Sequence, residues 1–517
     1  MRHDVRPSGD RRSWWLREAL AAEAPDLTDA APPLIGTTRA DVVVLGGGYT
    51  GLWTAYRLSE LDPAARIVVI EADICGGGPS GRNGGFATGW HDELPTLVER
   101  YGDAGALRVA GAVADAVDEI GAWCDRHGVD AWYRKAGMVQ ASAAPAQDGG
   151  WDAAVAACRR LGDGEAYVPL APAEVRARVD SPVFRGGVFM RDAATIQPAS
   201  LARGLRRVLL ERGVVIHEGT WALAIDGVAP GWAGIARSAG RTLADLARPR
   251  LPRQLRRPHL SRTVGGVRVT TRSARGDGEV VADTVVVALN AWAAAWPMFG
   301  RRLVTWSSYI VLTEAIPDRL AEIGWTGGEG VTDARFTLHY LRTTPDGRIA
   351  IGGGGGRAGF GGRIGAAFTD DAVSARRAAD GLRRIFPSLS DVRIVDAWGG
   401  PIDITADHLP FFGTLAGGRV HFGHGYSGNG VAPAFVGGRV LAALATDRGD
   451  DSALALGLHR SEPRAFPPEP FRYAGARVIR EAIVRRELAE ERGEHPGVVV
   501  RELSRVPRRL GFHLGPE

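Results

Sequence analysis

Residues 41–71 read DVVVLGGGYTGLWTAYRLSELDPAARIVVIE, and this stretch decides the fold. It opens with a β-branched run typical of a buried strand and passes through a glycine turn into a helical pattern over about 49–61. After Pro63 the chain returns to a second apolar strand over 66–70. Strand, helix and strand within about 30 residues form a βαβ unit. The sequence therefore predicts an α/β domain that begins with this unit.

Three glycines, Gly46, Gly48 and Gly51, form G-x-G-x-x-G at the start of the helix, around Thr50. The first permits a tight turn, the second lets the backbone approach a pyrophosphate, and the third lets the helix pack on the strand. The helix N-terminus adds free N–H groups and a positive dipole end. Glu71 follows about 20 residues later, where a carboxylate can accept hydrogen bonds from ribose hydroxyls. This combination predicts dinucleotide binding, and a glycine turn in an empty α/β domain is the alternative.

The segment after Glu71 favours FAD over NAD. Residues 76–86 read GGGPSGRNGGF, whereas an NAD domain would continue into its next helix and strand. A glycine-rich loop with serine, arginine and asparagine suits a second close approach to a larger cofactor, and a flexible surface loop is the alternative. The loop residues assigned to the cofactor are Ser80, Gly81, Arg82, Asn83, Gly84 and Gly85.

Composition limits the class of protein. A chain of 517 residues fits two or three domain-sized cores. A formal net charge of +4 is too small to indicate a nucleic-acid partner, and the basic stretch 237–262 lacks interleaved aromatic residues. No apolar run is long enough for a transmembrane span, and the N-terminus lacks the apolar part of a signal peptide.

The three cysteines, Cys75, Cys124 and Cys158, show no metal-binding or disulfide spacing. They predict no metal site and a reducing, cytoplasmic location. Lys135 is the only lysine, and this arginine-rich composition is typical of a GC-rich bacterium.

Three motifs together resemble the D-amino acid oxidase-like FAD oxidoreductases. They are GGGYTGLWTAYRLSE from Gly46, SGRNGGF from Ser80 and GYSGNGVAP from Gly425. The resemblance extends over roughly residues 13–450, and the most similar branch is that of the γ-glutamylputrescine oxidoreductase-like proteins, relatives of glycine oxidase and sarcosine oxidase. It implies hydride transfer to flavin from a carbon next to an amine nitrogen, hydrolysis of the resulting imine, and oxygen as acceptor.

The resemblance also implies roles for two further segments. Ala222 stands where the family usually has a valine whose backbone binds adenine. The C-terminal motif would meet the pyrimidine end of the flavin, because glycines before a helix near Val431 offer N–H groups to negative charge. An ordinary helix turn is the alternative. The motif residues assigned to the cofactor are Gly425, Ser427, Gly428, Asn429 and Gly430.

Two departures from the family pattern bear on the chemistry. Sarcosine oxidases attach FAD to a cysteine where Gly400 stands here, and other relatives attach it to a histidine where Asn83 stands, so we expect non-covalent FAD. Some of these oxidases activate oxygen with a lysine over the flavin, but Lys135 lies in a different segment. The alternatives are therefore a dehydrogenase that passes electrons to a quinone or a protein, or a flavin-binding protein without turnover.

Candidates for the substrate face are His339, Tyr340 and Arg342 in a probable strand, and His424 and Tyr426 beside the C-terminal motif. Arginine could bind a substrate carboxylate with two parallel hydrogen bonds. Ordinary packing or surface exposure is the alternative for each. The expected substrate is a small amine or amino acid, and the expected assembly is a monomer or a homodimer.

Two further features have structural interpretations. His91 is expected to be a solvated loop histidine, and Trp14–Trp15 is expected to pack on the body rather than form a lid.

The expected architecture is α/β, or α+β overall, with a Rossmann-type FAD-binding domain interleaved with a substrate domain on a mostly antiparallel sheet. The segments are an arm (1–39), the FAD-binding domain (40–130, 185–295 and 395–450, with an inserted loop at 228–262), the substrate domain (131–184 and 296–394), and a tail (451–517) with an amphipathic helix over 471–491.

Overall fold

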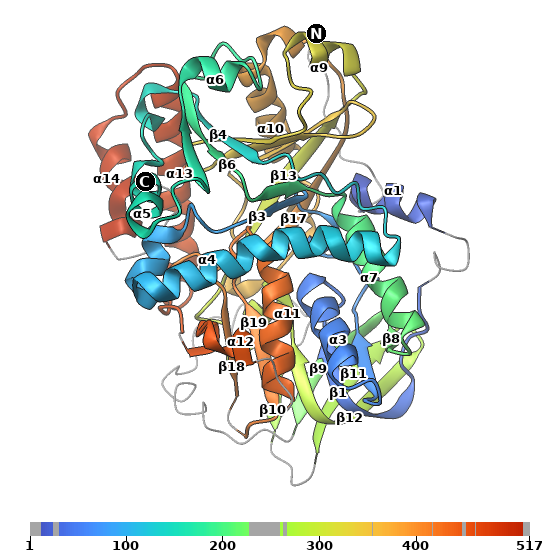
Figure 1. Ribbon diagram of the computed structural model, residues 1–517. Helices are drawn as coiled ribbons and strands as arrows, with labels where there is room; N and C mark the ends of the chain where they lie inside the picture. Colours follow the sequence, from blue (N-terminus) through green and yellow to red (C-terminus); the bar gives the residue numbers. More distant parts are fainter. Residues whose placement is uncertain are drawn as a thin grey trace.

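The computed structural model describes residues 12–23, 30–226, 259–261, 266–353, 355–415, 417–446, 451–460 and 462–509. Two large sheets dominate it, one in the lower half and one in the upper half of Figure 1. The mixed α/β class predicted from the sequence is confirmed.

The nine-stranded lower sheet is built around the predicted βαβ unit. Its centre is parallel, in the order β12 (Gly276–Val287), β1 (Gly36–Leu45), β2 (Ile67–Ile70) and β8 (Val215–His217). The valines and isoleucines of β1 and β2 are buried on both faces, as parallel strands require. The other strands are β9 (Thr220–Asp226), β10 (His259–Ser261), β11 (Val267–Ser273), β18 (Phe411–Thr414) and β19 (Val420–His424).

Strand β1 begins at Gly36, five residues earlier than the sequence suggests, because its first half pairs with residues 278–282 of β12. The arm predicted over 1–39 is therefore partly strand. The surface loop predicted over 228–262 lies outside the described residues, apart from β10.

Three helices pack on the parallel strands: α3 (Tyr49–Leu61), α7 (Pro198–Glu211) and α11 (Val431–Ala445). Helices α3 and α11 lie side by side in Figure 1. Leu52 of α3 and Val440 of α11 are fully buried in the same apolar cluster as Val44 of β1. This packing fixes where both helices begin.

The upper sheet has eight strands and is antiparallel except for one parallel pair, β14 with β4. This matches the mostly antiparallel sheet expected for a substrate domain. Its order is β17 (Ile394–Ile404), β13 (Val304–Thr313), β16 (Ile349–Gly353), β15 (His339–Thr343), β14 (Gly330–Asp333), β4 (Met138–Ser142), β6 (Gly186–Met190) and β5 (Tyr167–Leu170).

Two strands of this sheet come from segments that the sequence assigned to the FAD-binding domain. β6 pairs with β4 and β5, and β17 pairs with β13. The apolar character of both strands could not show which sheet they join. The domain boundaries themselves remain a prediction.

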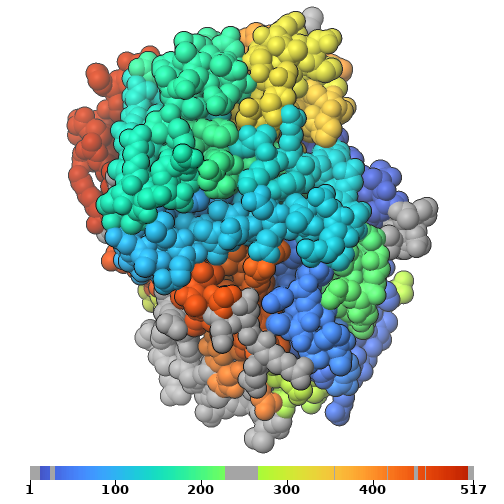
Figure 2. Space-filling view, in the orientation of Figure 1, coloured from blue at the N-terminus to red at the C-terminus, as the bar shows by residue number. Residues whose placement is uncertain are grey.

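The long helix α4 (Leu94–His127) runs across the junction of the two halves and covers it as a blue-to-cyan band in Figure 2. It kinks at Gly102, whose φ is 67°. The remaining elements are β3 (Phe86–Thr88), β7 (Ala193–Thr195), α5 (Asp152–Leu161), α6 (Pro172–Arg176), α9 (Pro317–Glu322), α10 (Ala372–Ile385) and α12 (Asp451–Ala455).

Helices near both ends of the described part of the chain pack on the body. In α1 (Trp14–Ala22), Trp15 and Leu16 are fully buried, which confirms packing rather than a lid for this helix. The tail forms α13 (Phe471–Glu491), with the predicted bounds, and α14 (Val498–Arg509). Glu487 of α13 accepts hydrogen bonds from Arg335 and from the Thr337 N–H, so α13 also packs on the body.

Within the described ranges, no helix is both long and apolar enough to cross a membrane. The same residues include no group of three histidine, cysteine or acidic side chains able to hold a metal ion.

Candidate flavin site

The first glycine turn leaves no space for side chains. A Cβ on Gly46, whose φ is 113°, would lie 2.3 Å from the Ala288 oxygen, and one on Gly51 would lie 2.0 Å from the Gly46 oxygen. Helix α3 begins after Gly48 without a side-chain cap. A Cβ on Gly48 would lie 2.9 Å from Ser80 Oγ, so this glycine leaves room for Ser80 beside the helix N-terminus. The turn therefore suits close approach by an anionic group.

Glu71 stands at the end of β2, as the motif predicts. Its Oε2 accepts the Gly47 N–H at 2.7 Å and its Oε1 accepts the Asp73 N–H at 2.8 Å. Burial raises the pKa of Glu71 to about 7. The Glu71 carbonyl accepts the Thr220 N–H at the start of β9, two residues before Ala222. Ala222 thus lies near the acid, and its adenine role remains a prediction.

The loop over residues 79–85 is held by its own polar side chains. Asn83 Nδ2 donates to the Pro79 and Ser80 carbonyls, and its Oδ1 accepts the Gly85 N–H at 2.8 Å. Arg82 is buried and donates from Nε to Gly77 O at 2.9 Å. Asn83 and Arg82 therefore hold the loop in its conformation through these hydrogen bonds.

Two hydrogen bonds join the first turn to this loop and to the C-terminal motif, and a third joins β3 to the C-terminal motif. Ser80 Oγ accepts the Tyr49 N–H at 2.8 Å, which ties the loop to α3. Thr50 Oγ1 donates to the Tyr426 hydroxyl at 3.0 Å, which ties the first turn to the C-terminal motif. Thr88 Oγ1 donates to Asn429 Oδ1 at 3.0 Å. The structure therefore brings together all three motifs that the sequence singled out.

The C-terminal turn has a strained backbone. Gly425, Ser427 and Gly428 all have positive φ, of 86°, 53° and 97°. Ser427 Oγ accepts the Thr405 N–H at 3.2 Å and donates to the Gly425 carbonyl. Helix α11 then begins after Gly430 without a side-chain cap, so its N-terminus is open in the same way as that of α3.

Asp403 anchors this turn and was missed by sequence reasoning. The residue lies in β17, and its buried carboxylate accepts the Gly425 N–H at 2.6 Å and Asn290 Nδ2 at 3.0 Å. Its own carbonyl accepts the Ser427 N–H. Burial raises the pKa of Asp403 to about 7. An acid between two isoleucines, in a strand that holds only one other acid, Asp396, was the one available signal.

The N-terminal arm packs against the loop over 79–85, a contact that the sequence also did not indicate. Ser13 Oγ donates to Gly81 O, and Gln197 Nε2 donates to the Trp15 carbonyl at 2.7 Å. The Trp15 ring packs edge-on against Trp398, with 5.7 Å between ring centroids. Arm and loop therefore form one packed unit.

Tyr340 and Arg342 lie two residues apart on one face of β15, and both face the loop. The Tyr340 ring packs against Phe86, and its hydroxyl lies 2.7 Å from Ser308 Oγ. Arg342 donates to the Gly85 carbonyl at 3.1 Å and to the Ile196 carbonyl. Its guanidinium lies over the Trp15 ring, and burial lowers its pKa to about 9. Arg342 is only 2% exposed, so the structure does not present it as an open partner for a substrate carboxylate.

The histidine candidates do not line the site. His339 Nδ1 lies 2.7 Å from Asp333 Oδ2, and a Cβ on Gly381 of α10 would lie 2.4 Å from His339 Nε2. His339 therefore faces α10, and its assignment to the substrate face is wrong. His91 is buried and bonds to Asp163, so the prediction of a solvated loop histidine is also wrong.

His424 and Tyr426 are packed into the protein. His424 is fully buried among phenylalanines, which include Phe299, and burial lowers its pKa to about 3. The Tyr426 hydroxyl reaches Gly437 of α11. These contacts favour packing over catalysis for both residues.

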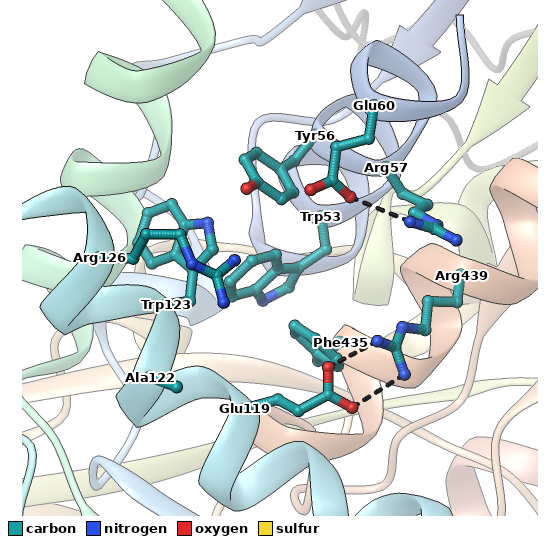
Figure 3. Close-up of a pocket in the computed structure, with 10 residues that line it drawn as sticks. All are labelled: Trp53, Tyr56, Arg57, Glu60, Glu119, Ala122, Trp123, Arg126, Phe435 and Arg439. Atoms are coloured by element: carbon teal, nitrogen blue, oxygen red, sulfur yellow. Dashed lines mark hydrogen bonds and ion pairs between the residues drawn. The ribbon is translucent and has the colours of Figure 1, made fainter.

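A separate pocket of about 170 Å³ lies on the outer side of α3, α4 and α11 (Figure 3). Trp53, Trp123 and Phe435 form its aromatic walls, and the Arg439–Glu119 ion pair closes one side. None of its lining residues belongs to the two turns or to the loop, so it is distinct from the candidate flavin site.

Comparison with known proteins agrees with this geometry. Probable oxidoreductase OrdL of Rhizobium meliloti is 29% identical over 88% of this chain and 92% of its own length. The γ-glutamylputrescine oxidoreductase of Escherichia coli is 27% identical over 79% and 84%. The crystal structure of glycine oxidase from Geobacillus kaustophilus shares the fold, with a TM-score of 0.57 at 18% identity over 80% of this chain and 95% of that chain.

The family model described as FAD dependent oxidoreductase (DAO) matches residues 41–249 and 252–444, well over half of the chain. The match contains both glycine turns, Glu71 and the loop between them. The chain therefore belongs to the DAO family of FAD-dependent oxidoreductases and is an enzyme.

Proposed function

We propose that this enzyme oxidises a C–N bond of a small amine or amino acid, with FAD bound non-covalently and oxygen as acceptor. The observation that carries the proposal is the meeting of two helix N-termini that begin after glycines, Gly48 and Gly430, with the loop over 79–85 next to Tyr340. When bound there, FAD supplies the hydride acceptor, and the imine product hydrolyses in water.

The residues around the site position groups and do not offer a strong base. Burial raises the pKa of Tyr340 to about 12, so the side chain stays a neutral phenol near neutral pH. Its hydroxyl and Ser308 form a polar pair on the sheet that faces the loop. The substrate amine would therefore bind in its neutral form.

Non-covalent binding is supported by the residues at the two attachment positions. Gly400 has no side chain, and the Asn83 amide is engaged with the loop backbone. All three cysteines are buried and free, which also supports action in a reducing cytoplasm. We expect a monomer or a homodimer that does not bind nucleic acid.

A dehydrogenase that uses a quinone or a protein acceptor is the second candidate. The observation that favours it is the position of Lys135, whose Nζ pairs with Asp118 at 2.6 Å on α4. The lysine that activates oxygen in some relatives is therefore not available at this site.

An anaerobic screen tests both candidates. The purified FAD-loaded enzyme is mixed with γ-glutamylputrescine, glycine and other small amines and amino acids, and bleaching of the flavin absorbance is followed. At least one amine should bleach it, while the matching carboxylic acid without the amine should not. If dithionite bleaches the flavin and no amine does, amine oxidation is excluded. Admitting air to the reduced enzyme then separates oxidase from dehydrogenase.

A further inference from the structure

Two buried charges of opposite sign hold the segments assigned to the flavin. Arg342 binds the loop through the Gly85 carbonyl, and Asp403 binds the C-terminal turn through the Gly425 N–H. Both come from the upper sheet, Arg342 from β15 and Asp403 from β17, and both are at least 98% buried. The upper sheet thus places a cation next to the loop over 79–85 and an anion next to the C-terminal turn.

Neither charge has a partner of opposite sign among the described residues. The hydrogen bonds of Arg342 go to the carbonyls of Gly85, Ile196 and Thr343. The hydrogen bonds to the Asp403 carboxylate come from neutral groups, the Gly425 N–H and the Asn290 amide. A buried charge without a counter-ion is costly, and in a poorly screened interior its field reaches neighbouring groups.

Other buried ions of the upper sheet are paired. Arg335 bonds to Glu487 and Glu491, and Asp333 contacts His339 and Arg384. Arg342 and Asp403 differ from these residues in having no counter-ion within the described part of the chain.

We propose that Arg342 and Asp403 are positioning residues that set the reduction equilibrium of the flavin in opposite directions, Arg342 favouring and Asp403 opposing the negatively charged reduced state. The inference rests on the proposed function only in placing the flavin against these two segments.

The environment of Asp403 makes its proposed effect on flavin reduction depend on pH. Tyr426, the titratable side chain that interacts with Asp403, has its pKa raised by burial and stays neutral near pH 7. Asp403, with its pKa raised to about 7, is charged above that pH and neutral below it. Its effect on the flavin should therefore appear only above about pH 7.

The test measures the equilibrium between bound flavin and a reference dye during slow anaerobic reduction, without any amine. Above pH 7, Asp403→Asn should shift this equilibrium about tenfold toward reduced flavin, and Arg342→Met should shift it about tenfold the other way. Arg342→Lys should restore most of the loss. Asp333→Asn and Arg335→Met are the matched buried controls and should shift it less than twofold.

The pH series keeps the test decisive if Arg342→Met does not fold. The difference between wild type and Asp403→Asn should vanish below about pH 6. A difference that is constant with pH, or shifts of both variants in one direction, would overturn the proposal. Failure of the wild type to bind FAD would overturn this proposal and the proposed function together, whereas failure of amines to bleach a normal flavin would overturn only the function.

Discussion

The two glycine turns that open α3 and α11 have the same form but are held in place differently. Both start a helix without a side-chain cap, and the two helices pack side by side. The first turn, at 46–51, is determined largely by close backbone contacts inside one βαβ unit, such as that of Gly51 with Gly46 O. The second, at 425–430, depends on Asp403 and Thr405 from a strand of the other sheet. One turn can be recognised from local sequence, while the other requires the tertiary structure.

Gly46→Ala should have the largest effect. A methyl group there would collide with Ala288 O at a backbone conformation that favours glycine, so we expect a loss of about 2–4 kcal/mol of unfolding free energy and no retained FAD. Denaturant unfolding and flavin absorbance after gel filtration measure both. Gly111→Ala in α4, where no atom lies within 4 Å of the added methyl, is the control and should be neutral or stabilising by up to about 1 kcal/mol.

Glu71→Gln should weaken FAD binding about tenfold, because an amide has only one oxygen for the hydrogen bonds that a carboxylate accepts with two. Titration of apoprotein with FAD, followed by quenching of flavin fluorescence, measures the change. Glu60→Gln, at an exposed acid on α3, should leave the affinity unchanged. Equal affinities of wild type and Glu71→Gln would remove Glu71 from the site.

The pH dependence of the unfolding free energy of the apoprotein should report on the protonation of Glu71. The folded-state pKa of Glu71 is raised to about 7 from the ordinary 4.5, so between these values the folded chain keeps a proton that the unfolded chain releases. Its contribution to unfolding free energy therefore falls as pH rises from about 4.5 to 7. Glu71→Gln should remove this part of the slope in urea unfolding across that range. An unchanged slope would contradict the raised pKa.

Ser427→Ala should weaken the second turn more modestly. It removes the hydroxyl that accepts the Thr405 N–H and keeps a side chain at φ 53°, so we expect a loss of about 1–2 kcal/mol and severalfold weaker FAD binding. Ser427→Gly loses the same hydroxyl without the steric strain and should recover about half of the loss. If Ser427→Gly loses more unfolding free energy than Ser427→Ala, backbone strain at this position does not contribute to the loss.

Ser80→Ala should have the smallest effect. It removes the acceptor of the Tyr49 N–H, a single hydrogen bond worth about 1 kcal/mol, and leaves the glycine contacts intact. A twofold to fivefold change in FAD affinity is expected in the same titration. A complete loss of FAD would mean that this loop, rather than the first turn, dominates binding.

The sequence predicts well those features that depend on residues close together along the chain. The bounds of α3 and α13 and the position of the first turn follow from glycine spacing and helical periodicity. The sheet that β6 and β17 join could not be predicted, because the apolar sequence of a strand does not identify the strand with which it pairs.

The same limit applies to side chains in the site. His339, Tyr340 and Arg342 are adjacent in sequence, yet alternation along β15 turns His339 toward α10 and the other two toward the loop. The burial of Arg342 depends on Trp15, more than 300 residues away in the chain. Only the folded chain shows that this arginine supports the loop and is closed to a substrate carboxylate.

The most direct test of the flavin site is the amount and attachment of flavin in the purified protein. The protein is saturated with FAD, freed of excess cofactor and denatured, and the flavin is then measured in the supernatant and on the polypeptide. We expect about one FAD per chain, all of it released. Flavin that stays on the polypeptide would contradict non-covalent binding, and a protein that holds no FAD would contradict the site itself.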